Sequence, residues 1–337
     1  MRFLAAALML TLTASAQSWI PQTSNTTASL RGLSAVDDRV VWASGTSGTF
    51  LRTTDGGTTW IASTVPGAET LDFRGVHAIN ENTAYLMSSG PGEKSRIYKT
   101  TDAGGHWALQ FTNPDPKGFL DSIAFRDATH GIVVGDAIGG SAEVRITNDG
   151  GAYWERQTTP PALPNEGSFA ASNTCLFLLP PNRAWFVTGG TGAARVFRST
   201  DGGRSWTAAI TPIRNDSASA GIFSIAFASP TRGIIVGGDY SRDQEARGNL
   251  AITTDGGRSW SAPAAGPGGF RSAVAWVPRL KLWIATGTSG SDYSTDGGQT
   301  WKAFDSGSFN ALSFAPNGAG WAAGAKGRIA RFQPAPR

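Results

Sequence analysis

Three arginines hold similar positions just before short apolar runs that we predict to be β-strands. Arg31, Arg74 and Arg271 each lie two residues before such a run, and Asp121 and Asn310 lie near the start of two others. A guanidinium binds a carboxylate or a phosphate through two parallel hydrogen bonds. If the runs are equivalent strands of a repeat, these five side chains meet at one binding site for a partner.

The arginines also allow a purely structural interpretation. Each could pair with a nearby carboxylate, such as Asp72 or Asp121, and tie neighbouring units together. The sequence leaves both interpretations open.

Other side chains give little sign of catalysis or of metal binding. The single cysteine, Cys175, precedes the apolar run 176–179 and is expected in the core rather than as a nucleophile. The three histidines are scattered, so we expect no metal site, and no phosphate-binding glycine loop precedes a helix. We therefore expect no catalytic residue and no cofactor. Glycosidase chemistry needs a pair of carboxylates, and the spacing of the candidates singles out no such pair. The candidates are Asp136, Asp239, Asp243 and Glu245.

The composition favours strands and tight turns. The 337 residues include 43 Gly and 12 Trp, and 16% are charged, with a formal net charge of +4. Basic residues form no run, so we expect no nucleic-acid partner.

Residues 1–16 have the features of a signal peptide. Arg2 precedes the apolar stretch 3–12, and Ala14-Ser15-Ala16 offers small residues for cleavage before Gln17. The apolar stretch is too short to span a bilayer. We expect an exported protein, periplasmic or secreted, that is not embedded in the membrane.

One eight-residue motif recurs six times along the chain. It reads Ser/Thr-x-Asp-x-Gly-x-x-Trp, and successive copies are 41 to 54 residues apart. The aspartates are Asp55, Asp102, Asp149, Asp201, Asp255 and Asp296, and the tryptophans are Trp60, Trp107, Trp154, Trp206, Trp260 and Trp301. Repeats of this period are typical of propeller blades.

A second pattern counts seven repeats. Short apolar runs led by a bulky residue recur at 40–43, 84–87, 131–134, 184–187, 233–236, 282–285 and 320–323. After the last run, residues 326–332 resemble the strand before a motif, and Ser18-Trp19-Ile20-Pro21 resembles the end of one. The seventh repeat is therefore split between the two ends of the chain.

These patterns predict an all-β fold, a seven-bladed β-propeller of four-stranded blades. It spans residues 17–337 as a single domain, and the N-terminal strand closes the ring by pairing with the C-terminal blade. Inner strands are expected at 33–36, 76–79, 122–125, 224–227, 273–276 and 311–314. The Asp-Gly-Gly motifs are turns with a structural role, because each offers one carboxylate where a calcium loop needs several.

The motifs resemble the Asp-box, or bacterial-neuraminidase, repeat. That repeat occurs in sialidases, in sortilin-type receptors and in photosystem II stability and assembly factors. The seven-fold count and the expected export are most similar to the assembly-factor group. That resemblance implies a non-catalytic propeller with an arginine-rich surface that binds membrane proteins. We accordingly expect a protein partner from the membrane or envelope, and a monomer.

A glycan-active or glycan-binding propeller is the alternative. Sialidases carry an arginine triad, but they have six blades and an early Phe/Tyr-Arg-Ile-Pro stretch. Here Leu30-Arg31-Gly32 and Phe73-Arg74-Gly75 lack the Ile-Pro.

Long loops place the binding face opposite the Asp boxes. Loops on a rigid scaffold often carry function. The segments longer than a turn requires are 88–95, 136–143, 155–172, 208–220 and 238–249.

Overall fold

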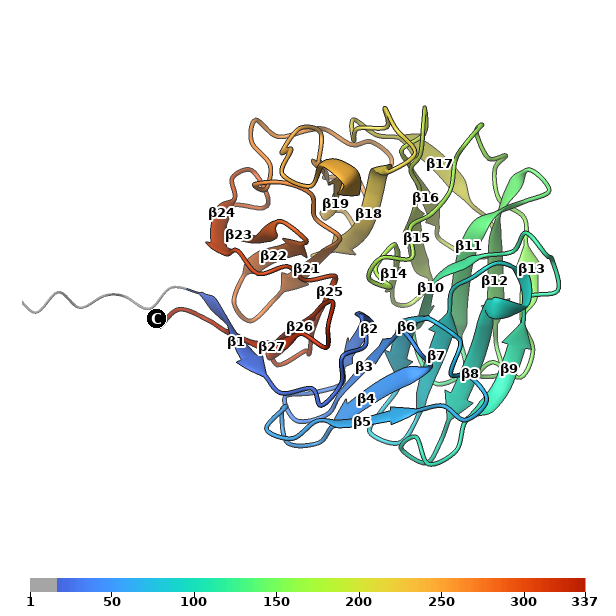
Figure 1. The fold of residues 1–337 in the computed structure, drawn as a ribbon. Helices are drawn as coiled ribbons and strands as arrows, with labels where there is room; N and C mark the ends of the chain where they lie inside the picture. Colours follow the sequence, from blue (N-terminus) through green and yellow to red (C-terminus); the bar gives the residue numbers. More distant parts are fainter. Residues whose placement is uncertain (1–16, 337) are drawn as a thin grey trace, which may run out of the picture.

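Short apolar segments between glycine-rich turns form seven antiparallel β-sheets around one axis (Figure 1). The structure, a computed structural model, describes residues 17–336. Each sheet is a blade of the ring, and the first strand of each blade lies nearest the axis. The predicted seven-bladed propeller is confirmed.

The blades follow the order of the chain. Blade 1 has β2 (Leu30–Ala35), β3 (Val41–Gly45), β4 (Thr49–Thr53) and β5 (Ile61–Thr64), and blade 2 has β6 (Phe73–Ala78), β7 (Ala84–Ser88), β8 (Arg96–Thr100) and β9 (Ala108–Thr112). Blade 3 has β10 (Leu120–Phe125), β11 (Gly131–Ile138), β12 (Ser141–Thr147) and β13 (Glu155–Gln157), and blade 4 has β14 (Leu176–Leu179), β15 (Arg183–Val187), β16 (Arg195–Ser199) and β17 (Thr207–Ile210). Blade 5 has β18 (Ala220–Phe227), β19 (Gly233–Asp239) and β20 (Leu250–Thr253), and blade 6 has β21 (Ala273–Val277), β22 (Leu282–Gly287), β23 (Gly290–Ser294) and β24 (Lys302–Asp305). Blade 7 has β25 (Ala311–Phe314), β26 (Gly320–Ala323) and β27 (Ile329–Gln333), completed by β1 (Ser18–Gln22).

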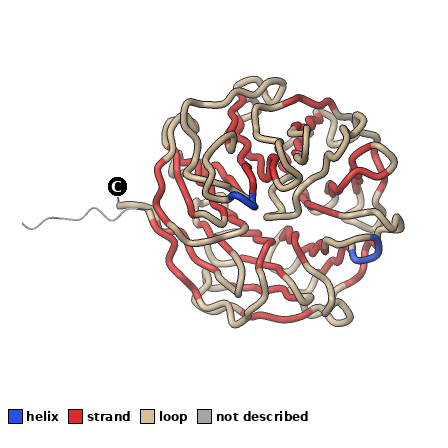
Figure 2. The backbone as a smooth tube through the Cα atoms, turned by 45° about the horizontal axis from the view of Figure 1, so that its top comes forward, coloured by secondary structure: helices blue, strands red, loops and turns tan. Residues whose placement is uncertain are grey.

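Helix is confined to two short 3-10 segments among the described residues (Figure 2). These are η1 (Gly92–Lys94) and η2 (Tyr240–Arg242), both in long loops. No helix in residues 17–336 is long and apolar enough to cross a membrane.

The two ends of the chain complete one blade. Residues 18–22 of β1 pair antiparallel with residues 329–333 of β27, and Trp19 lies opposite Phe332. Trp19 is buried, and its indole Nε1 donates to the Ser291 hydroxyl of blade 6 at 3.0 Å. The predicted closure of the ring is confirmed, and Trp19 takes the place of a box tryptophan.

Blade 5 has only three regular strands. Its fourth strand is reduced to one bridge, in which Ile252 and Ser261 exchange backbone hydrogen bonds of 2.9 and 3.0 Å. Pro263 and Pro267 follow, and a proline has no N–H to donate to a ladder.

The hydrophobic core lies between blades rather than inside each one. One cluster combines Leu33 and Trp60 of blade 1 with Trp321 and Ile329 of blade 7. Another combines Trp19 of blade 7 with Ile284 of blade 6. The apolar faces of neighbouring sheets therefore bury one another all round the ring.

The Asp boxes form the turns after the third strand of six blades. The Ser or Thr hydroxyl donates to the Asp carboxylate at 2.8 Å in all six. The same hydroxyl accepts a hydrogen bond from the N–H of the glycine at the fifth position of the motif, at 2.9–3.0 Å. The carboxylate also accepts the N–H of the residue before the tryptophan at 2.8–3.1 Å. These bonds satisfy the polar backbone of the turn locally.

Candidate functional site

Four inner strands carry a β-bulge at the same place, at the end away from the Asp boxes. The strand registers skip one residue there: Arg31 in β2, Arg74 in β6, Asp121 in β10 and Phe223 in β18. A bulge turns the extra side chain out of the regular alternation of a strand. All four skipped side chains line one central cavity of about 500 Å³. We call the face on which it lies, opposite the boxes, the loop face.

One side of the cavity is cationic. The Arg31 guanidinium has neither a hydrogen bond nor an ion pair within residues 17–336, and burial together with the nearby Arg74 lowers its pKa. Arg74 donates from Nε to Asp72 Oδ2 at 2.7 Å. The other oxygen of Asp72 is buried without a hydrogen-bond partner. Arg31 is thus a partly buried cation whose donors are not used by the described part of the chain.

The next side carries two carboxyl groups. Asp121 is 1% exposed, and neither of its oxygens has a hydrogen-bond partner. Burial, reinforced by the charge of Asp136, holds the pKa of Asp121 well above its ordinary value, against the attraction of Arg74 and of the nearby Ala170 N–H. Burial also raises the pKa of Asp136, although the Ser168 N–H donates to it at 2.9 Å. The neutral carboxyl form is therefore favoured at Asp121.

The opposite wall is aromatic. The rings of Phe169 and Phe223 stack with centroids 3.9 Å apart, and Phe270 meets Phe223 edge-on at 4.7 Å. Tyr240, in η2, stands at the rim and is 54% exposed. This wall offers a preformed surface for an apolar or aromatic group.

The segment 168–174 crosses the axis of the ring and forms the floor of the cavity. Its Asn173 amide donates to Val76 in blade 2 and to Ile123 in blade 3, at 3.2 and 3.1 Å. Its Ser172 hydroxyl donates to the Ser272 carbonyl of blade 6 at 2.8 Å. Arg74 reaches the Ala170 carbonyl at 3.5 Å. Contacts to three blades hold this segment across the channel, so we call it the floor segment.

The prediction that Arg271 reaches the channel is wrong. Its backbone N–H donates to Gly237 of the preceding blade, as Leu30 donates to Gly324 and Phe309 to Gly287. Arg271 is therefore the equivalent of Leu30, one position before Arg31, and Ser272 lines the cavity instead. A shift of one residue turns a strand side chain to the other face.

Arg271 instead forms a buried ion pair. Its Nε donates to Asp292 Oδ2 at 2.7 Å, and its Nη2 contacts the same oxygen. Both side chains are almost fully buried. The pairing with a nearby carboxylate that the sequence left open is found at Arg271 and, through Asp72, at Arg74, but not at Arg31. Arg271 and Asp292 belong to the same blade, and Asp72 lies two residues before Arg74, so neither ion pair ties two blades together.

Asn310 lines the cavity as expected, and it also ties the ring. Its amide donates to the Leu30 carbonyl of blade 1 at 3.0 Å. Arg31, Arg74, Asp121 and Asn310 thus meet at one cavity, and an arginine triad is not assembled there.

The long segments contribute unequally to the cavity. Residues 168–171, Asp136 and Tyr240 line it, whereas 88–95 and 208–220 do not. Residues 136–143 are the tip of the β11–β12 hairpin, which turns at Gly139 and Gly140 with positive φ. The aromatic wall is the part that the sequence analysis missed. Phe223 carried a signal, because it stands at the same repeat position as Arg31.

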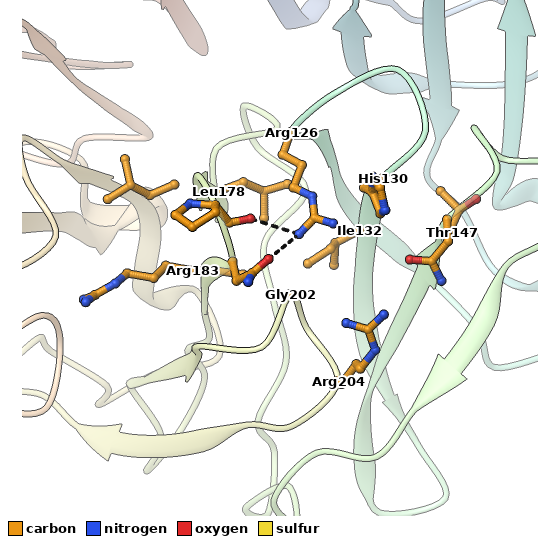
Figure 3. A pocket seen from close by; sticks show the side chains of 14 residues that line it. Arg126, His130, Ile132, Thr147, Leu178, Arg183, Gly202 and Arg204 are labelled. Atoms are coloured by element: carbon orange, nitrogen blue, oxygen red, sulfur yellow. Dashed lines mark hydrogen bonds between the residues drawn. The ribbon is translucent and has the colours of Figure 1, made fainter.

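A second pocket lies between blades 3 and 4, on the face of the boxes (Figure 3). Its volume is about 20 Å³, which is room for about one water molecule. Arg126 donates to the Pro181 carbonyl and to Asn182 Oδ1 at 3.0 and 2.9 Å, as the dashed lines show. Arg126 therefore ties blades 3 and 4. Because this pocket is so small, the central cavity is the better candidate site.

Within residues 17–336 no group of three or more His, Cys, Asp or Glu side chains could hold a metal ion. Asp239 and Glu245, two of the carboxylates considered for glycosidase chemistry, are ion-paired with Arg242 and Arg214 respectively.

Comparisons with known proteins agree with the fold. The BNR/Asp-box repeat family model matches residues 292–303, around the sixth box. Among curated proteins, none matches the chain. A structure of YCF48 bound to a D1 peptide is similar, with 20% identity and a TM-score of 0.68, covering 93% of this chain and 96% of that one. YCF48 from Cyanidioschyzon merolae has 18% identity and a TM-score of 0.65, covering 95% of this chain and 99% of that one.

The expected resemblance to the photosystem II assembly-factor group is confirmed at the level of the fold. The chain is a seven-bladed propeller that carries a BNR/Asp-box repeat and shares its fold with YCF48 over nearly its whole described length.

Proposed function

We propose that this protein is a non-catalytic propeller that binds a polypeptide segment of a protein partner at the central cavity of the loop face. The observation that carries the proposal is the cavity itself. It places the unpaired Arg31 guanidinium opposite a wall of stacked rings. A peptide offers both a carboxylate and apolar side chains to such a surface.

The similar YCF48 structure adds support, because it contains a bound D1 peptide on the same fold. An assembly-factor-like role follows by analogy, in which the propeller holds part of another protein while that protein is built.

The location of the partner belongs to the same proposal. The features of residues 1–16, which lie outside the described residues, favour export, and an exported binding protein would meet membrane or envelope proteins. We propose that it acts as a monomer in the periplasm or outside the cell.

Site-specific photocrosslinking tests the proposal. A photoreactive p-benzoylphenylalanine replaces Tyr240, which is 54% exposed at the cavity rim, and in a matched control it replaces Tyr153, which is 69% exposed in the third Asp box. In envelope fractions of the source cells, Tyr240→p-benzoylphenylalanine should give a discrete adduct that mass spectrometry identifies as a protein, and the control should not. Equal adducts at both positions, or an adduct that persists after Arg31→Met, would contradict a partner site at the cavity.

Activity measurements test the non-catalytic part. Fluorogenic glycosides incubated with the full-length mature chain should give no turnover. Turnover that disappears on Asp136→Asn would establish the glycan-active alternative instead.

A further inference from the structure

We propose that the central cavity recognises a free carboxylate attached to a bulky apolar side chain, and that in the partner this group is the C-terminal residue of the polypeptide. The inference rests on the proposed function, because it specifies which part of a partner enters the site. Four features of the cavity support it.

The first feature is the unused guanidinium. Arg31 makes no hydrogen bond or ion pair within residues 17–336, although the charge of Asp72 attracts it, while Arg74 keeps only one carboxylate contact, to Asp72. Two neighbouring guanidiniums with free donors bind an anion, and a carboxylate accepts two parallel hydrogen bonds from one of them.

The second feature is Asp121, which lies at the wall of the same cavity and whose two buried oxygens make no hydrogen bond within residues 17–336. Burial raises the pKa of this carboxyl, which favours the protonated form, and that form carries one O–H donor. A ligand carboxylate between Arg31 and an Asp121 side chain turned towards the cavity would satisfy both, since it accepts from a guanidinium on one side and from an O–H on the other. The burial cost of Asp121 is then relieved by the ligand.

The third feature is the aromatic wall, which faces this polar corner across one cavity. Phe223 stacks on Phe169 and meets Phe270 edge-on, and both Phe223 and Phe270 are almost fully buried, so the wall is fixed before a ligand arrives. It suits an aliphatic or aromatic side chain attached close to the carboxylate.

The fourth feature is the blind floor. Asn173 and Ser172 bond the floor segment to blades 2, 3 and 6, and we infer that this crossing closes the ring to a polypeptide. A chain must enter from the loop face and stop. A chain end meets this constraint and brings a carboxylate, whereas an internal Asp or Glu side chain would require the backbone to turn back at the rim.

The experiment is an affinity selection on the full mature chain with defined peptide pools. One pool contains random heptapeptides with a free C-terminal carboxylate, and the second is the same pool amidated at the C-terminus. Retained peptides are identified by mass spectrometry, and the best of them are measured by fluorescence anisotropy as acid and amide. We expect enrichment of free acids ending in Phe, Leu, Ile or Met, and an affinity of the acid roughly tenfold to a hundredfold above that of the amide.

Two variants link this preference to the cavity. Arg31→Met should reduce the acid-to-amide ratio to near one, and this substitution breaks no contact that the fold uses. Arg247→Met, an exposed arginine elsewhere on the loop face, should leave the ratio unchanged. A ratio that survives Arg31→Met would overturn the inference.

Other outcomes separate the inference from the proposed function. If acid and amide bind equally well, a peptide segment is still bound and only the chain-end inference fails. Selection of internal Asp or Glu in the amidated pool also overturns it. If N-acetyl-L-phenylalanine binds as tightly as the best peptide acid, the site recognises a small free acid, and the chain-end inference fails. If no peptide of either pool binds and Tyr240→p-benzoylphenylalanine gives no adduct, both proposals fail.

Discussion

Asp121 is a carboxyl group buried without a hydrogen-bond partner, and its charge state sets a pH dependence of stability. Its folded pKa lies above the unfolded value of about 3.9, so below about pH 4 it is protonated in both states. As the pH rises, the unfolded chain ionises it more readily, and the free energy of unfolding falls. Asp121→Asn removes this loss and should raise the free energy of unfolding by about 1–3 kcal/mol at pH 7, with no gain below about pH 4.

Urea unfolding across this pH range measures the effect, with Asp216→Asn as a control of opposite sign. The hydrogen bond from Arg214 lowers the pKa of Asp216 to about 2, so its contribution is present above the unfolded pKa and lost as the pH falls towards 2. Asp216→Asn should therefore lose stability at pH 7. An Asp121→Asn variant less stable than the parent at pH 7 would contradict the neutral, unpartnered carboxyl.

The two arginines that the sequence treats alike should respond differently to the same substitution. Arg271→Met leaves Asp292 buried without its cation and should lower the free energy of unfolding by about 3–5 kcal/mol. Arg31→Met breaks no described contact and should change it by less than about 0.5 kcal/mol. Thermal unfolding of both purified variants measures the difference, and equal destabilisation would mean that Arg31 has a structural role after all.

At the scale of the element, the Asp box is a turn that satisfies its own backbone. Asp255 accepts from the Thr253 hydroxyl and from the Ser259 N–H, at 2.8 and 3.1 Å. Asp255→Ala removes these bonds and should lower the free energy of unfolding by about 1–2 kcal/mol without affecting the crosslink at Tyr240. Asp38→Ala, at an exposed position, serves as the control in urea unfolding. A folded Asp255→Ala variant that no longer forms the crosslink would place partner binding on the box face.

The strands and turns could be predicted because the same local sequence signals recur in each repeat. The box motif and the bulky residue of the second strand recur often enough to define blades, and Cys175 with the strand that follows it was recognisable as core. The register of each inner strand was harder to predict. Nothing local to Arg271 reveals that Val274, rather than Ala273, is equivalent to Leu33, because the offset depends on where the strand pairs with its neighbour.

The cavity was predictable only in part, for a similar reason. Arg31, Arg74, Asp121 and Asn310 come from repeat positions, which the sequence displays. Phe169 and the floor segment come from a long loop whose path across the axis is set by distant contacts to blades 2, 3 and 6. No periodicity predicts that path.

At the scale of the whole molecule, one strand pairing holds the ring shut. Trp19 packs against Phe304, Phe309 and Phe332 and joins blades 6 and 7. Trp19→Ala should lower the free energy of unfolding by about 3–5 kcal/mol, whereas Ile20→Ala on the exposed face of the same strand should have little effect. Urea unfolding followed by tryptophan fluorescence and by circular dichroism measures both. Similar losses in the two variants would mean that the N-terminal strand is only loosely attached.

The pairing of β1 with β27 also orders events during synthesis. Blade 7 is complete only when both β1 and β27 have been synthesised, because its outer strand comes from the N-terminal side of the described chain and its other three strands from the C-terminal side. A circular permutant, with residues 17 and 336 joined by a short linker and new ends opened in the turn between blades 2 and 3, would make all seven blades contiguous in sequence. Its strands could then assemble blade by blade in the order in which they emerge.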